Sequence, residues 1–182
     1  MPMDIEKLKE LGIRNVFGVF GRGARGETLA RGCHMGHILQ DVKVLGIRTI
    51  IDLRTADHND KLERRCGSVG LDYYHIPIDS KGVDAIELRK RLDCLFRLLD
   101  GDGFYISCQQ GLHRTDIALA LYFFYHDDRE IPQMAGHRTK GFLRCDDIMR
   151  RINAMRCFFP DTSEAMFEER RSRFLSFNRN FQ

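Results

Sequence analysis

The stretch that decides the fold runs from Phe104 to Tyr125, with the sequence FYISCQQGLHRTDIALALYFFY. Its first residues, Phe104 to Ser107, form a short apolar run that predicts a buried strand. From Arg114 to Tyr125 nearly every residue is apolar, which predicts a central, buried helix. Between them stands Cys108, and five residues separate it from Arg114. The stretch therefore predicts a strand, a short loop and a helix.

The residues before this stretch predict more strands and helices in alternation. RTIIDL at Arg48–Leu53 and YYHIPI at Tyr73–Ile78 are typical of short strands. Asp84 and Glu87 are spaced as a capping pair at the start of an amphipathic helix. Further helices are expected at His37–Leu45, Phe142–Met155 and Thr162–Phe177. This order predicts an α/β fold with a central, mostly parallel sheet of about four to five strands flanked by helices.

The composition fits one soluble domain over residues 1–182. Hydrophobic residues make up 43% of the chain and charged residues 30%, enough for a real core. No apolar run approaches the ~20 residues of a membrane span, and the charged N-terminus does not resemble a secretory signal. We therefore expect a cytoplasmic protein whose six cysteines are reduced. A net charge of +3 is too small to indicate a nucleic-acid or membrane partner.

A glycine-dense stretch at Gly18–Gly36 is the one long segment that the pattern leaves irregular. Three arginines, Arg22, Arg25 and Arg31, are interleaved with its glycines. One interpretation is a mobile surface loop. The other is a basic loop that overhangs an anionic site.

The spacing from Cys108 to Arg114 suits a loop around one tetrahedral anion. Gly111 gives the loop backbone freedom, and Arg114 can bind two oxygens of the anion with its planar fork. The same positive surroundings would lower the pKa of the Cys108 thiol, and Thr115 can donate a hydrogen bond to the sulfur. The loop residues that would bind phosphate, together with Arg114, are Gln109, Gln110, Gly111, Leu112 and His113.

The motif CQQGLHRT resembles the signature of cysteine-dependent phosphatases of the dual-specificity and protein-tyrosine superfamily, most closely their atypical dual-specificity members. GIRTIIDLR at Gly46–Arg54 and YYHIPIDS at Tyr73–Ser80 look like the strands before the catalytic loop in that family. By motif the resemblance covers about residues 47–125. It implies a (phosphotyrosine protein phosphatase II)-like fold and a phosphocysteine intermediate, with no cofactor and no metal. A phosphorylated protein or a small phosphomonoester would be the substrate.

Such a mechanism also needs an acid to protonate the leaving oxygen. The resemblance assigns this role to Asp79, which stands 29 residues before Cys108. Asp84 is the alternative, although it suits a helix cap better. Asp52, in the IDLR motif, fits a structural role or a pairing with Arg54 better than that of an acid.

Three features depart from the family pattern. Ser107 stands where a histidine is usual, and Asp116 stands where a small residue is common. The loop also lacks the lysine that relatives acting on inositol phosphates often carry, although His113, Arg54 or the arginines within Gly18–Gly36 could supply charge. Phosphotyrosine or phosphoserine/threonine protein is therefore the preferred substrate class. Inositol phosphates or phosphoinositides, RNA 5′-triphosphate ends and a non-catalytic phosphate-binding module stay open as alternatives.

Two other groups of residues carry weaker signals. The segment Cys33–His37 holds nitrogen and sulfur ligands, but no second cluster completes a metal site. Four of the five cysteines outside the motif are expected as small buried side chains, and one of them could protect Cys108 as a disulfide partner. These are Cys66, Cys94, Cys145 and Cys157. The sequence does not indicate an oligomeric state.

Overall fold

A computed structural model describes most of the chain. The described residues are 5–13, 17–20, 28–32, 38–55, 60–78, 85–101, 103–109, 113–125 and 145–179. The chain divides into two compact units, Met1–Thr115 and Asp116–Gln182, and each is described by itself. A single phosphatase-like domain over residues 1–182 therefore stays a prediction.

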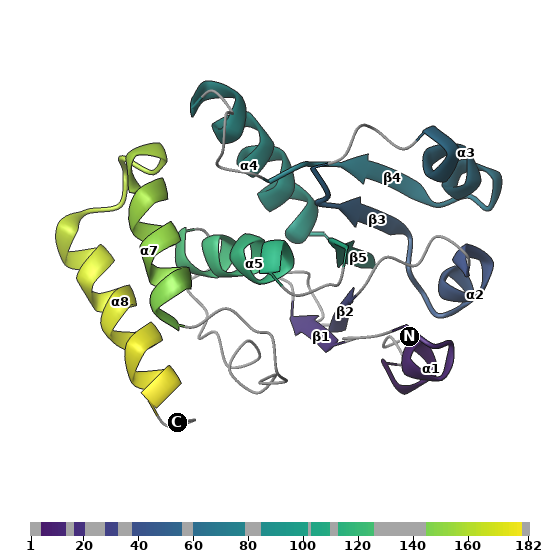
Figure 1. Cartoon of the computed structure of the whole chain (residues 1–182), viewed down its shortest axis with the longest axis horizontal. Coiled ribbons are helices and arrows are strands. Elements are labelled where there is room, and N and C mark those ends of the chain that lie inside the picture. Colours follow the sequence, from purple (N-terminus) through teal and green to yellow (C-terminus); the bar gives the residue numbers. More distant parts are fainter. Residues whose placement is uncertain are drawn as a thin grey trace. The chain divides into compact units, whose positions relative to one another are not determined.

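The first unit is built on one five-stranded sheet with the order β1-β2-β5-β3-β4 (Figure 1). Strands β2, β5, β3 and β4 run parallel, and β1 pairs antiparallel with β2 at the edge. Their bounds are β1 Phe17–Phe20, β2 Thr28–Gly32, β3 Thr49–Asp52, β4 Asp72–His75 and β5 Phe104–Ser107. The predicted α/β fold with a mostly parallel sheet is confirmed, and β5 lies at its centre.

The glycine-dense stretch is not one irregular loop, so the first interpretation of Gly18–Gly36 is wrong for the part that is described. Strands β1 and β2 fall inside it, and β2 pairs with β5 beside the catalytic motif. The sequence does not predict these strands, because glycine has weak strand propensity. Their conformation depends on pairing, of β2 with the central strand β5 and of β1 with β2. Arg22 and Arg25 lie outside the described residues, so the overhanging basic loop stays a prediction.

One face of the sheet is covered by three short helices, of which only α2 was expected. These are α1 (Ile5–Glu10), α2 (Leu39–Val44) and α3 (Asp60–Ser68), which Figure 1 shows grouped together. Ile50 on β3 and Tyr105 on β5 are register partners that point to this face. Both are buried with the apolar side of the three helices, which contributes Leu8, Leu39, Val42, Leu62 and Cys66.

The opposite face of the sheet carries Ile51 and Ile106, which are also fully buried. Helix α4 (Ala85–Leu99) belongs to the same unit and has the helical leucine spacing that the sequence predicts. Its buried side chains are Leu88, Leu92, Leu95, Phe96 and Leu99. Asp84, the expected cap of this helix, lies outside the described residues.

Helix α5 (His113–Tyr125) crosses from the first unit into the second, which also contains α7 (Cys145–Met155), a 3-10 turn (Arg156–Phe158) and α8 (Glu164–Arg179). Within this unit the Tyr125 ring stacks on Phe159 at a centroid distance of 4.0 Å. The Tyr125 hydroxyl donates to the carbonyl of Ile152 at 2.7 Å. The aromatic run Tyr122–Tyr125 is buried, as expected.

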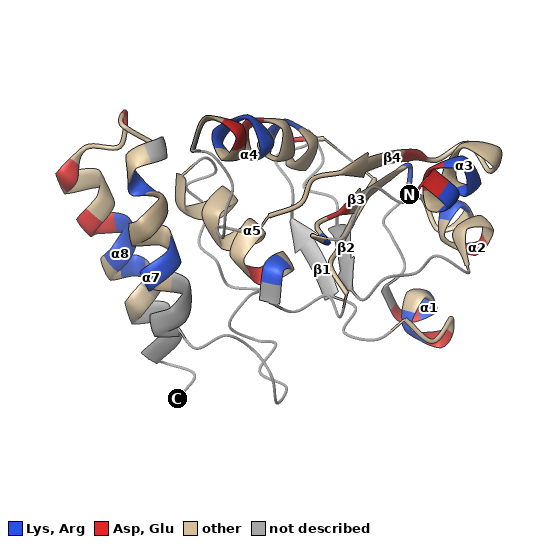
Figure 2. Cartoon of the chain, turned by 45° about the horizontal axis from the view of Figure 1, so that its top comes forward, with Lys and Arg blue, Asp and Glu red and all other residues tan. Residues whose placement is uncertain are grey.

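The charges on the described helices are mixed in sign. Figure 2 colours the ribbon by residue type and shows basic and acidic residues interspersed along α4 and α8. Several of them pair one turn apart, including Arg89 with Asp93 and Arg173 with Glu169. In the part of the chain that the structure describes, no helix is long and apolar enough to cross a membrane.

Candidate active site

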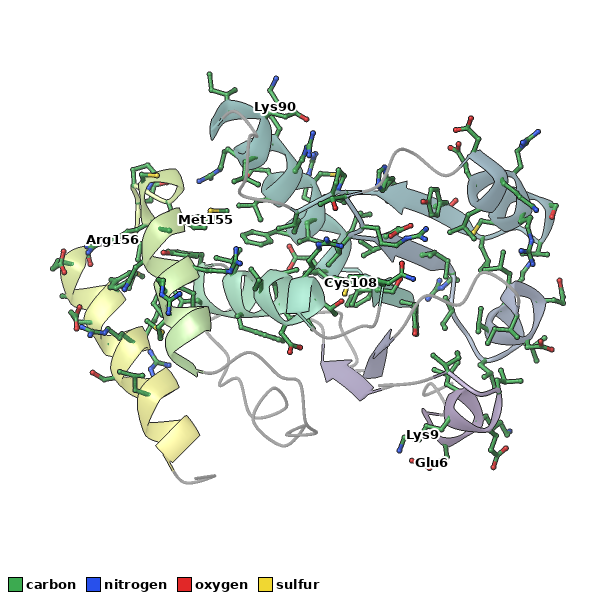
Figure 3. The ribbon with its side chains drawn as sticks, in the orientation of Figure 1. Glu6, Lys9, Lys90, Cys108, Met155 and Arg156 are labelled. Carbon is green, nitrogen blue, oxygen red and sulfur yellow. The ribbon has the colours of Figure 1, made fainter. Side chains whose placement is uncertain are left out.

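Cys108 follows the central strand of the sheet directly (Figure 3). All four residues of β5 are buried, and the Cys108 side chain is 4% exposed. Cys108 forms no disulfide with the other cysteines that the structure describes. Since β5 is held on both sides by parallel neighbours, the fold fixes the start of the CQQGLHRT motif.

Arg114 and Thr115 lie in the first turn of α5, which begins at His113. The Arg114 side chain is half-buried and Thr115 is fully buried. The hydroxyl of Thr115 has no hydrogen-bond partner among the described residues. Backbone amides in the first turn of a helix also lack helical partners, so they favour anions. The predicted order of strand, loop and helix is confirmed.

The loop between Cys108 and the helix is described only in part. Gln109 is exposed, whereas Gln110, Gly111 and Leu112 lie outside the described residues, as does the side chain of His113. The phosphate-binding role of these residues stays a prediction. The two ends of the loop are described. Cys108 is buried, and α5 begins within six residues of it, as a phosphate-binding loop requires.

Asp79, the predicted acid, also lies outside the described residues. The chain that leads to it is held beside β3, because the Ile76 amide donates to the Asp52 carbonyl at 2.9 Å. Arg91 on α4 donates to the Pro77 carbonyl at 3.1 Å. Both contacts guide the segment toward the carboxyl ends of the strands, the edge where ligands bind in parallel α/β sheets.

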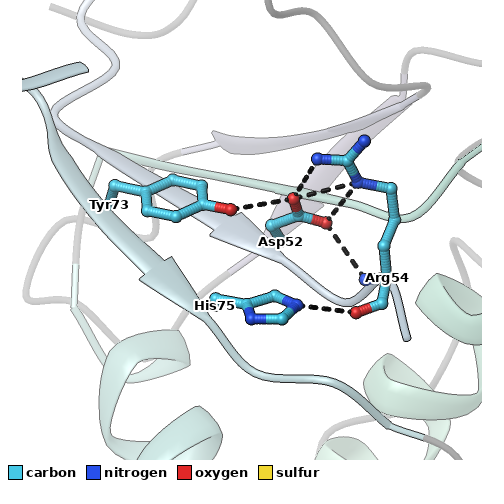
Figure 4. Close-up of polar contacts among 4 residues, drawn as sticks. All are labelled: Asp52, Arg54, Tyr73 and His75. Atoms are coloured by element: carbon cyan, nitrogen blue, oxygen red, sulfur yellow. Dashed lines mark hydrogen bonds and ion pairs between the residues drawn. The ribbon is translucent and has the colours of Figure 1, made fainter. Parts of the chain in front are cut away.

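The same sheet edge contains a cluster of polar side chains centred on Asp52 (Figure 4). Asp52 is 1% exposed, and its carboxylate accepts hydrogen bonds from Arg54 Nε at 2.9 and 3.0 Å. A terminal guanidinium nitrogen of Arg54 approaches it at 2.5 Å, and the Tyr73 hydroxyl donates to it at 3.0 Å. Nε2 of His75 lies 2.8 Å from the Arg54 carbonyl oxygen. The predicted pairing of Asp52 with Arg54 is confirmed.

Charge decides the ionisation of this cluster. Burial alone raises the pKa of Asp52, but the hydrogen bonds and positive charge of Arg54 outweigh burial and hold the pKa below its ordinary value. The hydrogen bond to Asp52 raises the pKa of Arg54. Burial, and then the neighbouring Asp52 charge, raise the pKa of Tyr73. At neutral pH the cluster therefore holds a carboxylate, a guanidinium and a neutral phenol.

The roles of Tyr73 and His75 in this cluster were not foreseen from the sequence. Asp52 and His75 are register partners on β3 and β4, and Tyr73 precedes His75 by two residues. Alternate residues of a strand share a face, so Tyr73 and His75 point to the side that carries Asp52. The alternation Tyr73-x-His75 was visible in the sequence. The register between β3 and β4, which places these two side chains beside Asp52, was not.

Ser107 shares the face of Asp52, since the two are register partners on β5 and β3. It is buried, and its hydroxyl has no hydrogen-bond partner among the described residues. A buried hydroxyl without a partner costs free energy. Asp116, the other departure from the family pattern, is buried as well.

The remaining cysteines differ from one another. Cys66 is buried, and burial raises the pKa of its thiol to about 11, as expected for an inert core residue. Cys94 is half-buried, whereas Cys157 is exposed, so the prediction of a buried side chain is wrong for Cys157. It lies in the 3-10 turn Arg156–Phe158 that follows α7. The side chain of Cys145 and the segment Cys33–His37 lie outside the described residues, among which no group of three or more metal-binding side chains occurs.

The fold is shared with solved structures of phosphatases at low sequence identity. A Shewanella putrefaciens protein assigned as a phosphatase matches with a TM-score of 0.59 and 18% identity, over 86% of this chain and 99% of its own. Kinase associated phosphatase, with its catalytic-site cysteine replaced by serine, matches with a TM-score of 0.61 and 17% identity, over 81% and 97% of the two chains. A Leishmania major protein assigned as a protein tyrosine phosphatase matches with a TM-score of 0.55 and 16% identity, over 76% and 97%. No protein-family model matches the sequence, and no curated protein matches it.

The chain therefore has the fold of the protein-tyrosine and dual-specificity phosphatases. The resemblance carried by CQQGLHRT is confirmed at the level of the fold. Its cysteine follows the central strand and its arginine opens the next helix, the order that the motif predicts.

Proposed function

We propose that this protein hydrolyses phosphate monoesters through a phosphocysteine intermediate. The observation that carries the proposal is the buried Cys108 at the end of the central strand, six residues before Arg114 in the first turn of α5. A cysteine beside a helix N-terminus and a guanidinium has the surroundings that favour a thiolate. The same donors suit the equatorial oxygens of a phosphoryl group.

The first step transfers the phosphoryl group to the enzyme. The Cys108 thiolate attacks phosphorus and forms a P–S bond, while the P–O bond to the leaving group breaks. Asp79 gives its proton to the leaving oxygen, since an unprotonated alkoxide or phenoxide leaves poorly. Arg114 and the amides of the loop from Gln109 to His113 stabilise the charge on the phosphoryl oxygens.

The second step restores the enzyme. Asp79, now a carboxylate, takes a proton from water as the water oxygen attacks phosphorus. The P–S bond breaks, inorganic phosphate leaves and Cys108 returns as a thiolate. The buried hydroxyl of Thr115 has no hydrogen-bond partner among the described residues. In both steps it would donate a hydrogen bond to the sulfur of Cys108.

Phosphotyrosine or phosphoserine/threonine protein is the substrate class that we favour. The motif lacks the lysine typical of relatives that act on inositol phosphates. Kinase associated phosphatase, among the structural matches, is a phosphatase of the same fold. Comparing turnover of phosphotyrosine peptide, phosphothreonine peptide, inositol phosphates and triphosphate-ended RNA under one set of conditions would test the preference.

Replacement of Cys108 tests the proposed reaction. The Cys108→Ser protein should bind aryl phosphates but lose turnover, because the serine hydroxyl is not ionised at neutral pH. Cys157→Ser is the matched control, since Cys157 is exposed and forms no disulfide with a described cysteine. Equal turnover by the Cys108→Ser protein and the unchanged protein would remove the basis of the proposal.

A non-catalytic phosphate-binding module is the second candidate, and Ser107 is the observation that favours it. A buried serine whose hydroxyl has no partner among the described residues replaces the histidine that is usual before the nucleophile. This candidate predicts that the unchanged protein binds a phosphopeptide and releases no phosphate from it.

A further inference from the structure

Within the described part of the chain, the Arg54 guanidinium interacts with Asp52 and, through a side-chain hydrogen bond, with Tyr73. Its Nε and one terminal nitrogen donate to the carboxylate of Asp52. The other terminal nitrogen donates to neither oxygen of Asp52, and the side chain is only 17% exposed. A guanidinium has five N–H donors in a fixed plane, so the outer edge keeps donors suited to an anion.

Arg54 and Cys108 follow the neighbouring strands β3 and β5 at the same edge of the sheet. The Leu53 amide donates to the Ser107 carbonyl at 2.8 Å, which continues the β3–β5 ladder one residue past both strands. Leu53 is therefore level with Cys108, and Arg54 is one residue beyond. Because neighbouring strands lie ~4.8 Å apart, the backbone of Arg54 is within reach of a small substrate bound at Cys108.

The Arg54 side chain is also held in place before any ligand arrives. Asp52 is buried and fixed by the Tyr73 hydroxyl at 3.0 Å, so the inner edge of the guanidinium has a rigid partner. The Arg54 backbone is fixed too, because its amide donates to Asp52 at 3.0 Å and its carbonyl oxygen lies 2.8 Å from His75 Nε2. A pre-ordered donor loses little entropy on binding.

We propose that Arg54 binds a second anionic group of the substrate, distinct from the phosphate that Cys108 attacks. The inference rests on the proposed phosphatase function and adds to it a preference for substrates with a carboxylate or a second phosphate near the scissile group, which in a phosphoprotein a neighbouring acidic or phosphorylated side chain would supply. Arg114 and the loop amides hold the scissile phosphate. Because Asp52 already balances the charge of Arg54, Arg54 recognises the second anionic group of the substrate by directed hydrogen bonds.

The test uses two phosphates of the same shape. In 3-carboxyphenyl phosphate the second group is an anion, and in 3-carbamoylphenyl phosphate it is a neutral amide. The unchanged protein should have the higher kcat/KM for the carboxylate. Arg54→Gln should reduce that preference roughly tenfold, the worth of one charge-assisted hydrogen bond. A third compound, 1,3-phenylene bisphosphate, asks whether a second phosphate is preferred to a carboxylate.

Two further variants separate binding from structure. Arg64→Gln removes an exposed charge on α3, and its preference should equal that of the unchanged protein. The double variant Asp52→Asn/Arg54→Gln removes the ion pair as a unit, so it avoids leaving a buried carboxylate uncompensated. It should show the same loss of preference as Arg54→Gln. If both substrates slow equally in the Arg54 variants, the residue acts on structure alone and the inference is wrong.

The role of Arg54 can still be tested if the protein does not hydrolyse phosphate monoesters. The same two compounds can then be titrated calorimetrically into the Cys108→Ser protein, with and without Arg54→Gln. Tighter binding of the carboxylate that depends on Arg54 would support the inference even without turnover. Equal affinities for the two compounds would overturn it.

Discussion

Asp52 and Ser107 are register partners on the adjacent parallel strands β3 and β5, one residue before the position of the candidate nucleophile. The Leu53 amide continues this pairing by donating to the Ser107 carbonyl at 2.8 Å. The buried Asp52–Arg54 pair is therefore attached through the sheet to the residue that leads into Cys108. Changes in that pair should alter both the stability of the sheet edge and the site beside it.

Replacement of Asp52 alone should destabilise the protein strongly. Asp52→Ala leaves the guanidinium of Arg54 and the hydroxyl of Tyr73 without their buried acceptor, which typically costs about 3 kcal/mol or more. Asp72→Ala, at an exposed position on β4, is the control and should cost far less. Urea unfolding of the two variants measures the difference, and similar midpoints would contradict a stabilising role for the pair.

Acid should weaken the same interaction. The pKa of Asp52 is lower in the folded chain than its ordinary value of ~3.9, so protonation favours the unfolded chain. The stability that Asp52 contributes is therefore complete above about pH 4 and is lost as the pH falls toward its folded pKa. The double variant Asp52→Asn/Arg54→Gln should lose less stability between pH 5 and 3 than the unchanged protein. Parallel acid titrations of unfolding free energy would test this.

Loss of the Thr115 hydroxyl should reduce activity without greatly reducing stability. Thr115→Val keeps the buried shape but removes a hydroxyl that has no hydrogen-bond partner in the described chain, so stability should not fall greatly. If the hydroxyl donates to the Cys108 sulfur during the reaction, kcat should drop roughly tenfold. Thr115→Ser retains the hydroxyl and should keep most of kcat. A purely structural residue would lower stability instead and leave kcat unchanged.

Asp79 should matter most when the leaving group is poor. Asp79→Asn cannot donate the proton, so kcat should fall steeply for phenyl phosphate and much less for 4-nitrophenyl phosphate, whose phenolate leaves readily. The acidic residue Asp84 offers the matched control, Asp84→Asn. If Asp84→Asn shows the dependence on the leaving group and Asp79→Asn does not, the acid has been assigned to the wrong carboxylate.

The sequence alone predicts the centre of this protein well and its edges poorly. The strand at Phe104–Ser107 and the helix from Arg114 to Tyr125 match β5 and α5 to within one residue, because long apolar runs in buried elements leave few alternatives. Strands β1 and β2 are hidden by glycines, since the conformation of β2 depends on pairing with β5 and that of β1 on pairing with β2. The short helices α1 and α3 carry too few apolar positions to indicate a period.

The candidate site likewise has residues that the sequence predicts and residues that it does not. Local spacing identifies Cys108, Arg114 and Thr115, because the motif is contiguous in the chain. The contacts of Tyr73 and His75 with the Asp52–Arg54 pair depend on the register between β3 and β4, which local sequence does not encode. Their polar character within a strand was the only advance signal.

The most direct test of the phosphatase proposal is the search for a phosphoryl group on Cys108 during turnover. The protein is mixed with an aryl phosphate, quenched in acid within the first turnovers and analysed by mass spectrometry after digestion. The proposed mechanism predicts one phosphoryl group on the peptide that contains Cys108, and none in the Cys108→Ser protein. Steady release of phosphate with no phosphoryl group on Cys108, or with equal release by the Cys108→Ser protein, would contradict it.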